Sequence, residues 1–346
     1  MSPTSAPDDT GADETDPTEP AAADPDEDTD ASANSAGDAD TDFDAAFVES
    51  LEGYIYFSSE RGDIEGELRD DLYVMDADGS DVRRLTETPL NEWWPEMHPD
   101  GGALLYGRTY PEDDNRAPRS GHSAWGVFYW GAGVEPVDIT DNNQFQSGTT
   151  WSPDGSKLLF SSGRGERAGF NDEGLYEMGG TNLWVMDADG SNYLQLTEDG
   201  AGSGTWSPDG SRIVFTQSLE GTEGRKLFVM NADGSGVELL ADGPGHYARP
   251  HWSPDGERIV FDNDRDGDCE IFVINADGSG ETQLTDNDAG DDFARWSPNS
   301  GAIVFTSDRD GNNEIYVMAA DGASQSNLSQ DPAFDALPSW SVHPWE

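Results

Sequence analysis

A five-letter phrase, WSPDG, repeats along this chain and limits what it can fold into. Three intact copies each precede a short apolar run, and a degraded copy reads WSPNS. A repeat of forty to fifty residues that is rich in strand-forming segments is typical of a β-propeller blade. The first position of the phrase is held by Met97, Trp151, Trp206, Trp252, Trp296 and Trp340. Successive residues of this set are 54, 55, 46, 44 and 44 positions apart.

Each repeat resolves into four short strands, as the fifth copy illustrates. The turns PDGE, RDGD and ADGS separate these strands. Pro presets φ, Asp bonds its own backbone and Gly supplies positive φ, so these residues favour tight turns. The segments IVF and IFVI are apolar on both faces, which predicts a sheet packed between two neighbouring sheets. The expected strands are residues 248–253, 258–264, 269–275 and 281–285.

The order of the strands indicates how the ring closes. The first unit, from Gly53, lacks its own first strand, and the last such strand, at 337–341, has no followers. The final strand is therefore expected to complete the first blade, which removes two open sheet edges. The predicted fold class is all-β: a six-bladed β-propeller of four-stranded antiparallel blades, spanning residues 47–346.

Residues 1–46 differ in composition from the repeats. They are almost entirely Asp, Ala, Thr, Pro, Ser, Glu and Gly, and the first basic residue of the chain is Arg61. Such a segment cannot bury enough apolar surface to offset its chain entropy. We expect residues 1–46 to be a disordered acidic tail that acts as a solvating spacer.

The charge balance restricts the partners. The formal net charge is −53, with only 18 lysines and arginines. This excludes nucleic acid and anionic membranes, which bind to positive surfaces. At about 1 M salt the Debye length is about 3 Å, so repulsion among exposed carboxylates largely disappears. We expect a salt-adapted, halophilic protein; the alternative is an acidic protein that binds cations or simply stays soluble.

Several classes of protein are disfavoured by what the sequence lacks. Cys269 is the only cysteine, so a disulfide framework and a thiolate metal cluster are excluded. No apolar run approaches the roughly 18 residues of a membrane span, and the first 30 residues lack the apolar core of a signal peptide. There is no G-x-S-x-G elbow, Walker loop or Rossmann fingerprint.

The combined pattern of the repeats, WSPDG…I.F…R.G…IYVM.ADGS…LT, resembles the TolB β-propeller repeat over residues 50–346. The resemblance implies a propeller that holds protein segments or small ligands at the mouth of its channel. It also implies a periplasmic or cell-surface location, although no export signal is visible and a cytoplasmic location stays open. Proteins of this family carry a small α/β domain before the propeller, where this chain has its acidic segment.

Strand direction predicts which face of the propeller is functional. The short SPDG and ADGS turns must lie on one face, and the longer, varied connections, including 108–124 and 162–180, on the other. Charged residues that precede each first strand should gather at the channel mouth. A cationic ligand, a basic peptide or a metal ion would suit this mouth, unless these are solvated loop charges. The candidate binding residues are Asn91, Glu92, Arg249, Asp291, Asp292, Arg295 and Asp335.

The run DNDRDGDCE, residues 262–270, is a candidate calcium site. Asp262, Asp264, Asp266 and Asp268 alternate as the oxygen ligands of an EF-hand loop do. Position twelve of that loop would be Val273, where calcium coordination needs Glu. The alternative is a hairpin turn between the second and third strands.

Taken together, the residues predict a monomeric propeller that binds a protein, a peptide or a small ligand and does not catalyse. No cofactor is expected apart from the calcium candidate. The alternative is a propeller enzyme, or a carbohydrate- or metal-binding propeller, that uses the acidic channel mouth.

Overall fold

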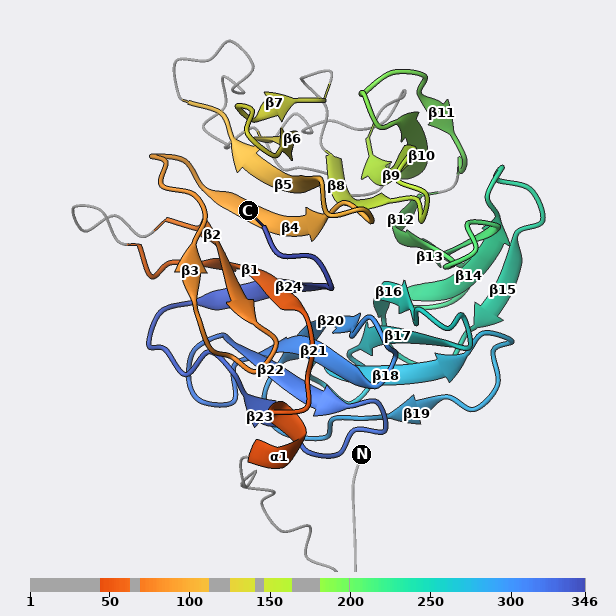
Figure 1. The fold of residues 1–346 in the computed structure, drawn as a ribbon. Coiled ribbons are helices and arrows are strands. Elements are labelled where there is room, and N and C mark those ends of the chain that lie inside the picture. Colours follow the sequence, from red (N-terminus) through yellow and green to blue (C-terminus); the bar gives the residue numbers. More distant parts are fainter. Residues whose placement is uncertain are drawn as a thin grey trace, which may run out of the picture. The chain divides into compact units, whose positions relative to one another are not determined.

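The fold is a ring of six small sheets (Figure 1). The computed structural model describes residues 44–62, 69–111, 125–140, 146–163, 181–198 and 200–345. Every sheet has four antiparallel strands, so the predicted fold class is confirmed. No helix among the described residues is long and apolar enough to cross a bilayer.

The blades follow the chain in order, and each is built outward from an innermost strand. Blade 1 contains β24 (Asp335–Ser341), β1 (Tyr54–Ser59), β2 (Asp71–Asp76) and β3 (Arg83–Arg84). Blade 2 contains β4 (Glu92–Met97), β5 (Ala103–Thr109), β6 (Trp125–Gly131) and β7 (Val137–Asp138). Blade 3 contains β8 (Gln146–Trp151), β9 (Lys157–Ser162), β10 (Asn182–Asp187) and β11 (Leu194–Gln195).

The second half of the ring repeats this arrangement. Blade 4 contains β12 (Ala201–Trp206), β13 (Arg212–Ser218), β14 (Arg225–Asn231) and β15 (Glu238–Ala241). Blade 5 contains β16 (Tyr247–Trp252), β17 (Arg258–Asn263), β18 (Glu270–Asn275) and β19 (Thr282–Gln283). Blade 6 contains β20 (Asp291–Trp296), β21 (Ala302–Ser307), β22 (Glu314–Ala319) and β23 (Ser326–Asn327).

The hydrophobic core is divided among the six boundaries between blades. Successive side chains of a strand point to opposite faces. In β1, Ile55 and Phe57 therefore pack against blade 6, whereas Tyr56 packs against blade 2. The repeated tryptophans belong to these boundary clusters, and Trp252, for example, packs with residues of blade 4. This arrangement explains why the second and third strands are apolar on both faces.

The repeated phrase folds into one tight turn on the face opposite to the longer connections. In blade 4 the Ser207 hydroxyl donates to Asp209 at 2.6 Å and accepts from the Arg212 amide at 2.9 Å. Hydrogen bonds from Ser207 and Ser211 hold the pKa of Asp209 down at about 2. Gly210, with φ 68°, closes the turn. The phrase is therefore a structural device that is repeated to join two strands.

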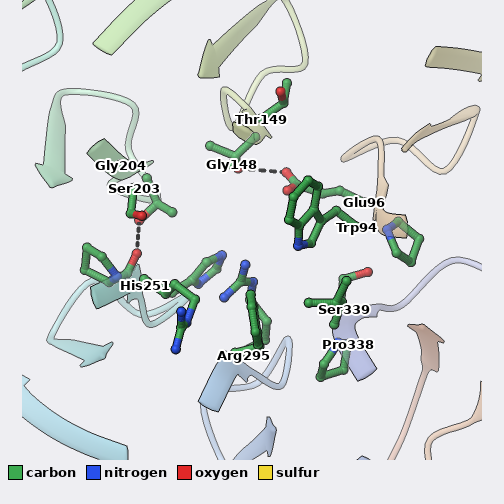
Figure 2. A pocket seen from close by; sticks show the side chains of 17 residues that line it. Trp94, Glu96, Gly148, Thr149, Ser203, Gly204, His251, Arg295, Pro338 and Ser339 are labelled. Carbon is green, nitrogen blue, oxygen red and sulfur yellow. Dashed lines mark hydrogen bonds between the residues drawn. The ribbon is translucent and has the colours of Figure 1, made fainter. Parts of the chain in front are cut away.

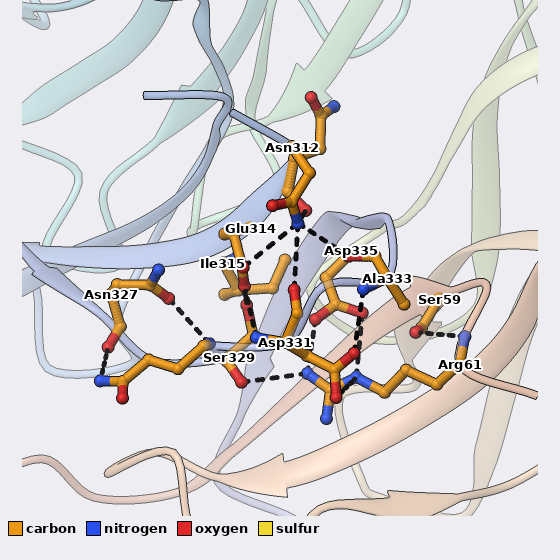
Figure 3. A network of polar contacts seen from close by, with 12 residues as sticks. Ser59, Arg61, Asn312, Glu314, Ile315, Asn327, Ser329, Asp331, Ala333 and Asp335 are labelled. Atoms are coloured by element: carbon orange, nitrogen blue, oxygen red, sulfur yellow. Dashed lines mark hydrogen bonds and ion pairs between the residues drawn. The ribbon is translucent and has the colours of Figure 1, made fainter. Parts of the chain in front are cut away.

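The ring is closed by the last strand, as predicted. β24 pairs antiparallel with β1, and Trp340 lies opposite Ile55. Figure 3 shows the polar network at this junction, in which Arg61 donates through Nε to Asp335 at 3.1 Å. Arg61 Nη2 also donates to the Ser329 carbonyl oxygen of blade 6, at 3.3 Å. The two ends of the ring are thereby joined by both backbone and side-chain bonds.

A short helix, α1 (Ala45–Val48), precedes the first blade. Asp44 caps it by accepting from the Phe47 amide at 3.1 Å, and also accepts from the Ser324 hydroxyl of blade 6 at 2.8 Å. Val48 is buried in the cluster between blades 1 and 6. The helix thus includes the last two residues of the segment predicted to be a tail, and all of that segment before Asp44 lies outside the described residues.

Candidate functional site

Each innermost strand has the same irregularity at its third residue. The register of its pairing with the next strand shifts there, which marks a β-bulge. The residue at this point has a left-handed φ, between 45° and 61°. Such a φ costs a non-glycine residue about 1 to 2 kcal/mol, and a bulge re-aims the neighbouring side chains. The six bulge residues are Trp94, Gly148, Ser203, Arg249, Phe293 and Leu337.

The bulges surround a cavity in the central channel (Figure 2). It has a volume of about 320 Å³ and is lined by residues from all six innermost strands. The lining does not repeat from blade to blade: it includes Trp94, Glu96, Ser203, His251 and Arg295. The strands that build the channel have the same form in each blade, whereas the side chains that line it differ between blades. These side chains therefore determine what the cavity can bind.

Arg249 is held in place by carboxylates outside the cavity. Its Nε pairs with the buried Asp262, and its Nη2 lies 3.2 Å from Asp292. Its guanidinium also stacks on the Phe293 ring, 4.2 Å from the centroid. Burial opposes its positive charge, but Asp262 and Asp292 raise the pKa of Arg249 above its usual value. Arg249 is therefore a permanently charged residue of the cavity wall whose guanidinium is already paired with carboxylates.

Arg295 is different because its charge has no close partner among the described residues. Its Nη1 donates to the carbonyl oxygen of Ala294 at 2.9 Å, and it forms no ion pair with a described carboxylate. Burial lowers the pKa of Arg295, although Glu96 and Asp262 partly oppose this. Figure 2 shows its side chain reaching into the cavity from the side opposite Gly148 and Thr149.

The other titratable groups in the cavity do not neutralise Arg295 directly. One oxygen of Glu96 accepts from the Thr150 hydroxyl at 2.7 Å and from the Trp151 amide at 2.9 Å. Burial raises the pKa of Glu96 despite these bonds. Burial, aided by Arg295, lowers the pKa of His251 to about 3, so this imidazole is neutral at ordinary pH.

Two hydroxyl groups of the lining lack hydrogen-bond partners within the part of the chain that the structure describes. Thr149 Oγ1 and Ser339 Oγ are both buried and unsatisfied there. Buried polar atoms in proteins are almost always paired, and an exception calls for an explanation such as a missing ligand or water. The cavity thus combines a guanidinium and two hydroxyls that can still form hydrogen bonds.

The seven candidate binding residues fall into two groups. Arg249 and Arg295 line the cavity, and Asp292 contacts Arg249 from outside it. The others occupy the start of innermost strands, where Glu92, Asp291 and Asp335 are fully buried. These three carboxylates face Arg108 at 3.9 Å, Arg309 at 2.8 Å and Arg61, respectively.

Asn91 also forms hydrogen bonds that join neighbouring segments of the fold. Its amide donates to Thr109 Oγ1 at 3.1 Å, and its side-chain oxygen accepts from the Asp70 amide at 3.3 Å. Three acids that the sequence placed at an acidic channel mouth, Glu92, Asp291 and Asp335, thus form ion pairs with arginines. Three further acidic or amide residues of the predicted mouth, Asp141, Asn142 and Asp199, lie outside the described residues.

The four aspartates of the calcium candidate lie along a strand end and a hairpin turn. Asp262 is buried in β17 and pairs with Arg249, whereas Asp266 is exposed. Asp264 accepts from the His246 amide at 2.7 Å, and its carbonyl accepts from the Gly267 amide at 3.2 Å. Among the described residues no three His, Cys, Asp or Glu side chains gather as a metal site would require.

The strand pairing places the longer connections on the face predicted to be functional. In blade 5, Tyr247 pairs with Asn263, which pairs with Glu270 on the next strand. The start of the innermost strand therefore lies at the same edge as the connection between the second and third strands. Most of the long connections predicted at 108–124 and 162–180 lies outside the described residues.

The sequence interpretation missed Trp94, Thr149 and Ser339. Their signal was present in the third to fifth positions of the innermost strands, which read WPE, GTT, SGT, RPH, FAR and LPS. The sixth position of these strands is Trp in every blade but one, whereas the third position differs in every repeat and the fourth and fifth vary. Within a regular propeller such variation indicates residues that face the channel.

The fold and the lined channel define a six-bladed β-propeller whose variable chemistry is concentrated on its axis. Residues 181–344, just under half of the chain, match the family described as the TolB beta propeller domain. This half of the chain is therefore similar to the propeller of TolB proteins.

Comparison with known proteins supports this class. The Tol-Pal system protein TolB of Anaeromyxobacter dehalogenans (strain 2CP-C) is 31% identical over 197 residues, 53% of this chain and 40% of the relative. The chain thus matches less than half the length of this curated relative.

Solved structures of low sequence identity share the fold. TolB from Acinetobacter baumannii has a TM-score of 0.66 at 19% identity, covering 83% of this chain and 66% of that chain. Kuenenia stuttgartiensis hydrazine synthase has a TM-score of 0.62 at 14% identity, covering 86% of this chain and 48% of that chain. Proteins of different function are thus built on this propeller, and function must be argued from the site.

Proposed function

We propose that this protein is a non-enzymatic propeller that binds a segment of another protein in its central channel. The observation that carries the proposal is the cavity of about 320 Å³, whose lining side chains change from blade to blade within a repetitive fold. Apolar side chains such as Trp94 and Phe293 alternate there with a few polar groups. This mixture is typical of recognition sites.

The proposal extends to the setting in which the protein works. A curated relative is named as a protein of the Tol-Pal system, and we place this chain in a cell envelope, outside the cytoplasm. The net charge of −53 favours a medium of high ionic strength, where repulsion between surface carboxylates is screened. Fractionation of native cells with an antibody to the chain tests the location, and recovery in the cytosol alone would refute it.

A display selection tests the binding function. Random peptides are selected on the immobilised protein in 2 M KCl and are then tested on two variants. Ser203→Trp fills the channel, and tryptophan is tolerated at that strand position because Trp94 occupies it in blade 2. Val237→Trp is the matched control, since Val237 is 49% exposed outside the channel in blade 4.

We expect enriched peptides that bind the wild-type protein and Val237→Trp but lose binding to Ser203→Trp. Absence of any peptide that depends on the channel would overturn the proposal. Turnover of a substrate in a panel of glycans and peptides, lost in Ser203→Trp, would instead establish the enzyme alternative. Binding of a small neutral sugar to the same channel would establish the carbohydrate alternative.

A further inference from the structure

We propose that the channel accepts a carboxylate group at Arg295, presented by an acidic side chain of the inserted protein segment. This inference rests on the proposed function and names the chemistry of the partner. It differs from the expectation of a cationic ligand, which was based on the acidity of the residues around the mouth.

Arg295 has N–H donors that form no hydrogen bond with a described residue. A guanidinium offers five N–H donors in a rigid fork, and the one hydrogen bond from Arg295 to a described residue goes to the adjacent Ala294 carbonyl oxygen. The other arginine of the cavity, Arg249, already holds two carboxylates. A partly buried guanidinium with free donors is a site for a planar anion, because bidentate carboxylate pairs match its geometry.

Two hydroxyl groups favour the same ligand for a reason that is independent of charge. Ser339 Oγ and Thr149 Oγ1 line the same cavity and have no hydrogen-bond partner among the described residues. A hydroxyl can donate to a carboxylate oxygen as well as accept from a backbone amide. An inserted segment can therefore satisfy these groups together with Arg295, whereas a bare apolar ligand would leave them unsatisfied at a cost of about 1 to 3 kcal/mol each.

The neighbouring groups leave Arg295 open to an incoming anion. Glu96 accepts two hydrogen bonds at one oxygen and forms no ion pair with Arg295, although its charge raises the pKa of Arg295, and His251 is neutral. Arg225, at the start of β14, likewise forms no ion pair with a described carboxylate. Burial is the main cause that lowers the pKa of the nearby His246; Asp264 opposes this, and the charge of Arg225 lowers it further.

The size and walls of the cavity favour a side chain over a large polyanion. About 320 Å³ holds one or two residues of a peptide. Apolar residues, namely Phe293, Leu337, Pro338 and Trp94, also line the cavity. An acidic residue next to an apolar one fits this combination of a guanidinium and apolar surfaces.

The test uses two probes that differ only in charge, N-acetyl-glutamate amide and N-acetyl-glutamine amide. The side-chain Nε–H signals of the ¹⁵N-labelled protein are recorded by NMR during titration in 0.15 M and 2 M KCl. The Arg295 signal is assigned as the one missing from Arg295→Met. Arg212→Met is the matched control, because Arg212 stacks on Trp252 at 4.9 Å and does not line the cavity.

We expect a saturable shift of the Arg295 signal with the glutamate probe and at least about tenfold weaker binding of the glutamine probe, the smallest difference expected for a charge-assisted hydrogen bond. Ser339→Ala should weaken binding a few-fold, and Arg212→Met should not change it. Equal binding of both probes, or no shift of Arg295 in the wild-type protein, would overturn the inference without reliance on any variant.

The peptides selected on the channel separate this inference from the proposed function. Channel-dependent peptides that contain Asp or Glu and lose at least about tenfold in affinity for Arg295→Met support both. Channel-dependent peptides that bind Arg295→Met equally well leave the proposed function standing and overturn the carboxylate site. Binding of the glutamate probe without any selected peptide overturns the protein segment as the source and identifies a small free acid instead.

Discussion

Arg61 and Asp335 are 274 positions apart in the chain, yet the guanidinium of one donates to both carboxylate oxygens of the other. Asp335 begins the last strand and is fully buried, and Arg61 follows the first strand of the same blade. The pair adds a charged bond to the backbone ladder that closes the ring. Without this closure, the propeller would expose two sheet edges at this position.

We predict that Asp335→Ala lowers the free energy of unfolding by about 3 kcal/mol, because it removes the closer carboxylate partner of a largely buried arginine and leaves only Asp331, at 3.7 Å. Arg61→Met combined with Asp335→Ala should cost less than the sum of the single changes. The measurement is urea denaturation in 2 M KCl. Asp187→Ala is the control: it breaks the exposed Lys157–Asp187 pair, which is worth at most about 1 kcal/mol. Equal losses for Asp335→Ala and Asp187→Ala would contradict the assigned role.

The bulges that shape the channel can be tested at blade 3, where the bulge residue is glycine. Gly148 has φ 59°, and a Cβ added there would meet no described atom within 4 Å. Gly148→Ala should therefore destabilise the protein by about 1 kcal/mol through backbone conformation alone. Ser203→Gly, at the same position of blade 4, should be neutral or stabilising by up to about 1 kcal/mol. No loss for Gly148→Ala in thermal unfolding would argue against a left-handed residue at this position.

A buried carboxylate in blade 5 should make stability depend on pH. Glu270 is 2% exposed, and burial raises its pKa to about 7, above the value of about 4.3 expected in the unfolded chain. Between these values the folded state binds more protons, so this group makes stability fall as pH rises from about 4 to 7. Glu270→Gln should remove that part of the decline and stabilise the protein at pH 8 relative to pH 5.

Glu257→Gln is the control for this pH dependence, because Glu257 is exposed on a turn of the same blade. Melting temperatures of both variants and of the wild-type protein are compared from pH 5 to pH 8. A wild-type slope that Glu257→Gln and Glu270→Gln leave equally unchanged would exclude Glu270 as its source.

The acidity of the chain predicts a strong dependence on salt. With a net charge of −53, lowering KCl from 2 M to 0.05 M lengthens the Debye length and should lower the melting temperature by about 10 °C or more. Circular dichroism measures this shift, and sorbitol at matched osmolality serves as a control for general solute effects. A melting curve that is the same at both KCl concentrations would refute salt adaptation.

The sequence predicted the architecture well because each blade is a local unit with its own turn signals. WSPDG and ADGS fix two turns per blade, and the unpaired strands at both ends define the closure between Trp340 and Ile55. The channel was harder to predict, since whether a carboxylate is exposed or buried depends on contacts across blade boundaries. Asp291 was expected at the mouth, but Arg309, 18 residues later, draws it into the framework.

The bulges could not be predicted from the sequence either. Glycine favours positive φ, but only Gly148 among the six bulge residues is glycine. The bulky residues Trp94, Phe293 and Leu337 adopt this φ because the surrounding ring imposes it. As a result, Arg249 and Arg295 were the two lining residues predicted as binding residues, and the others, such as Trp94, were recognised only from the structure.

Photo-crosslinking tests most directly whether a protein segment occupies the channel. p-Benzoylphenylalanine replaces Trp94 in the cavity or, as the control, Val237 on the outside of blade 4. The protein is irradiated in 2 M KCl with a peptide selected on the channel. We predict a crosslink from position 94, lost when Ser203→Trp fills the channel, and none from position 237. A crosslink from position 237 alone would show that the peptide binds the outer surface, and the account of the channel would be wrong.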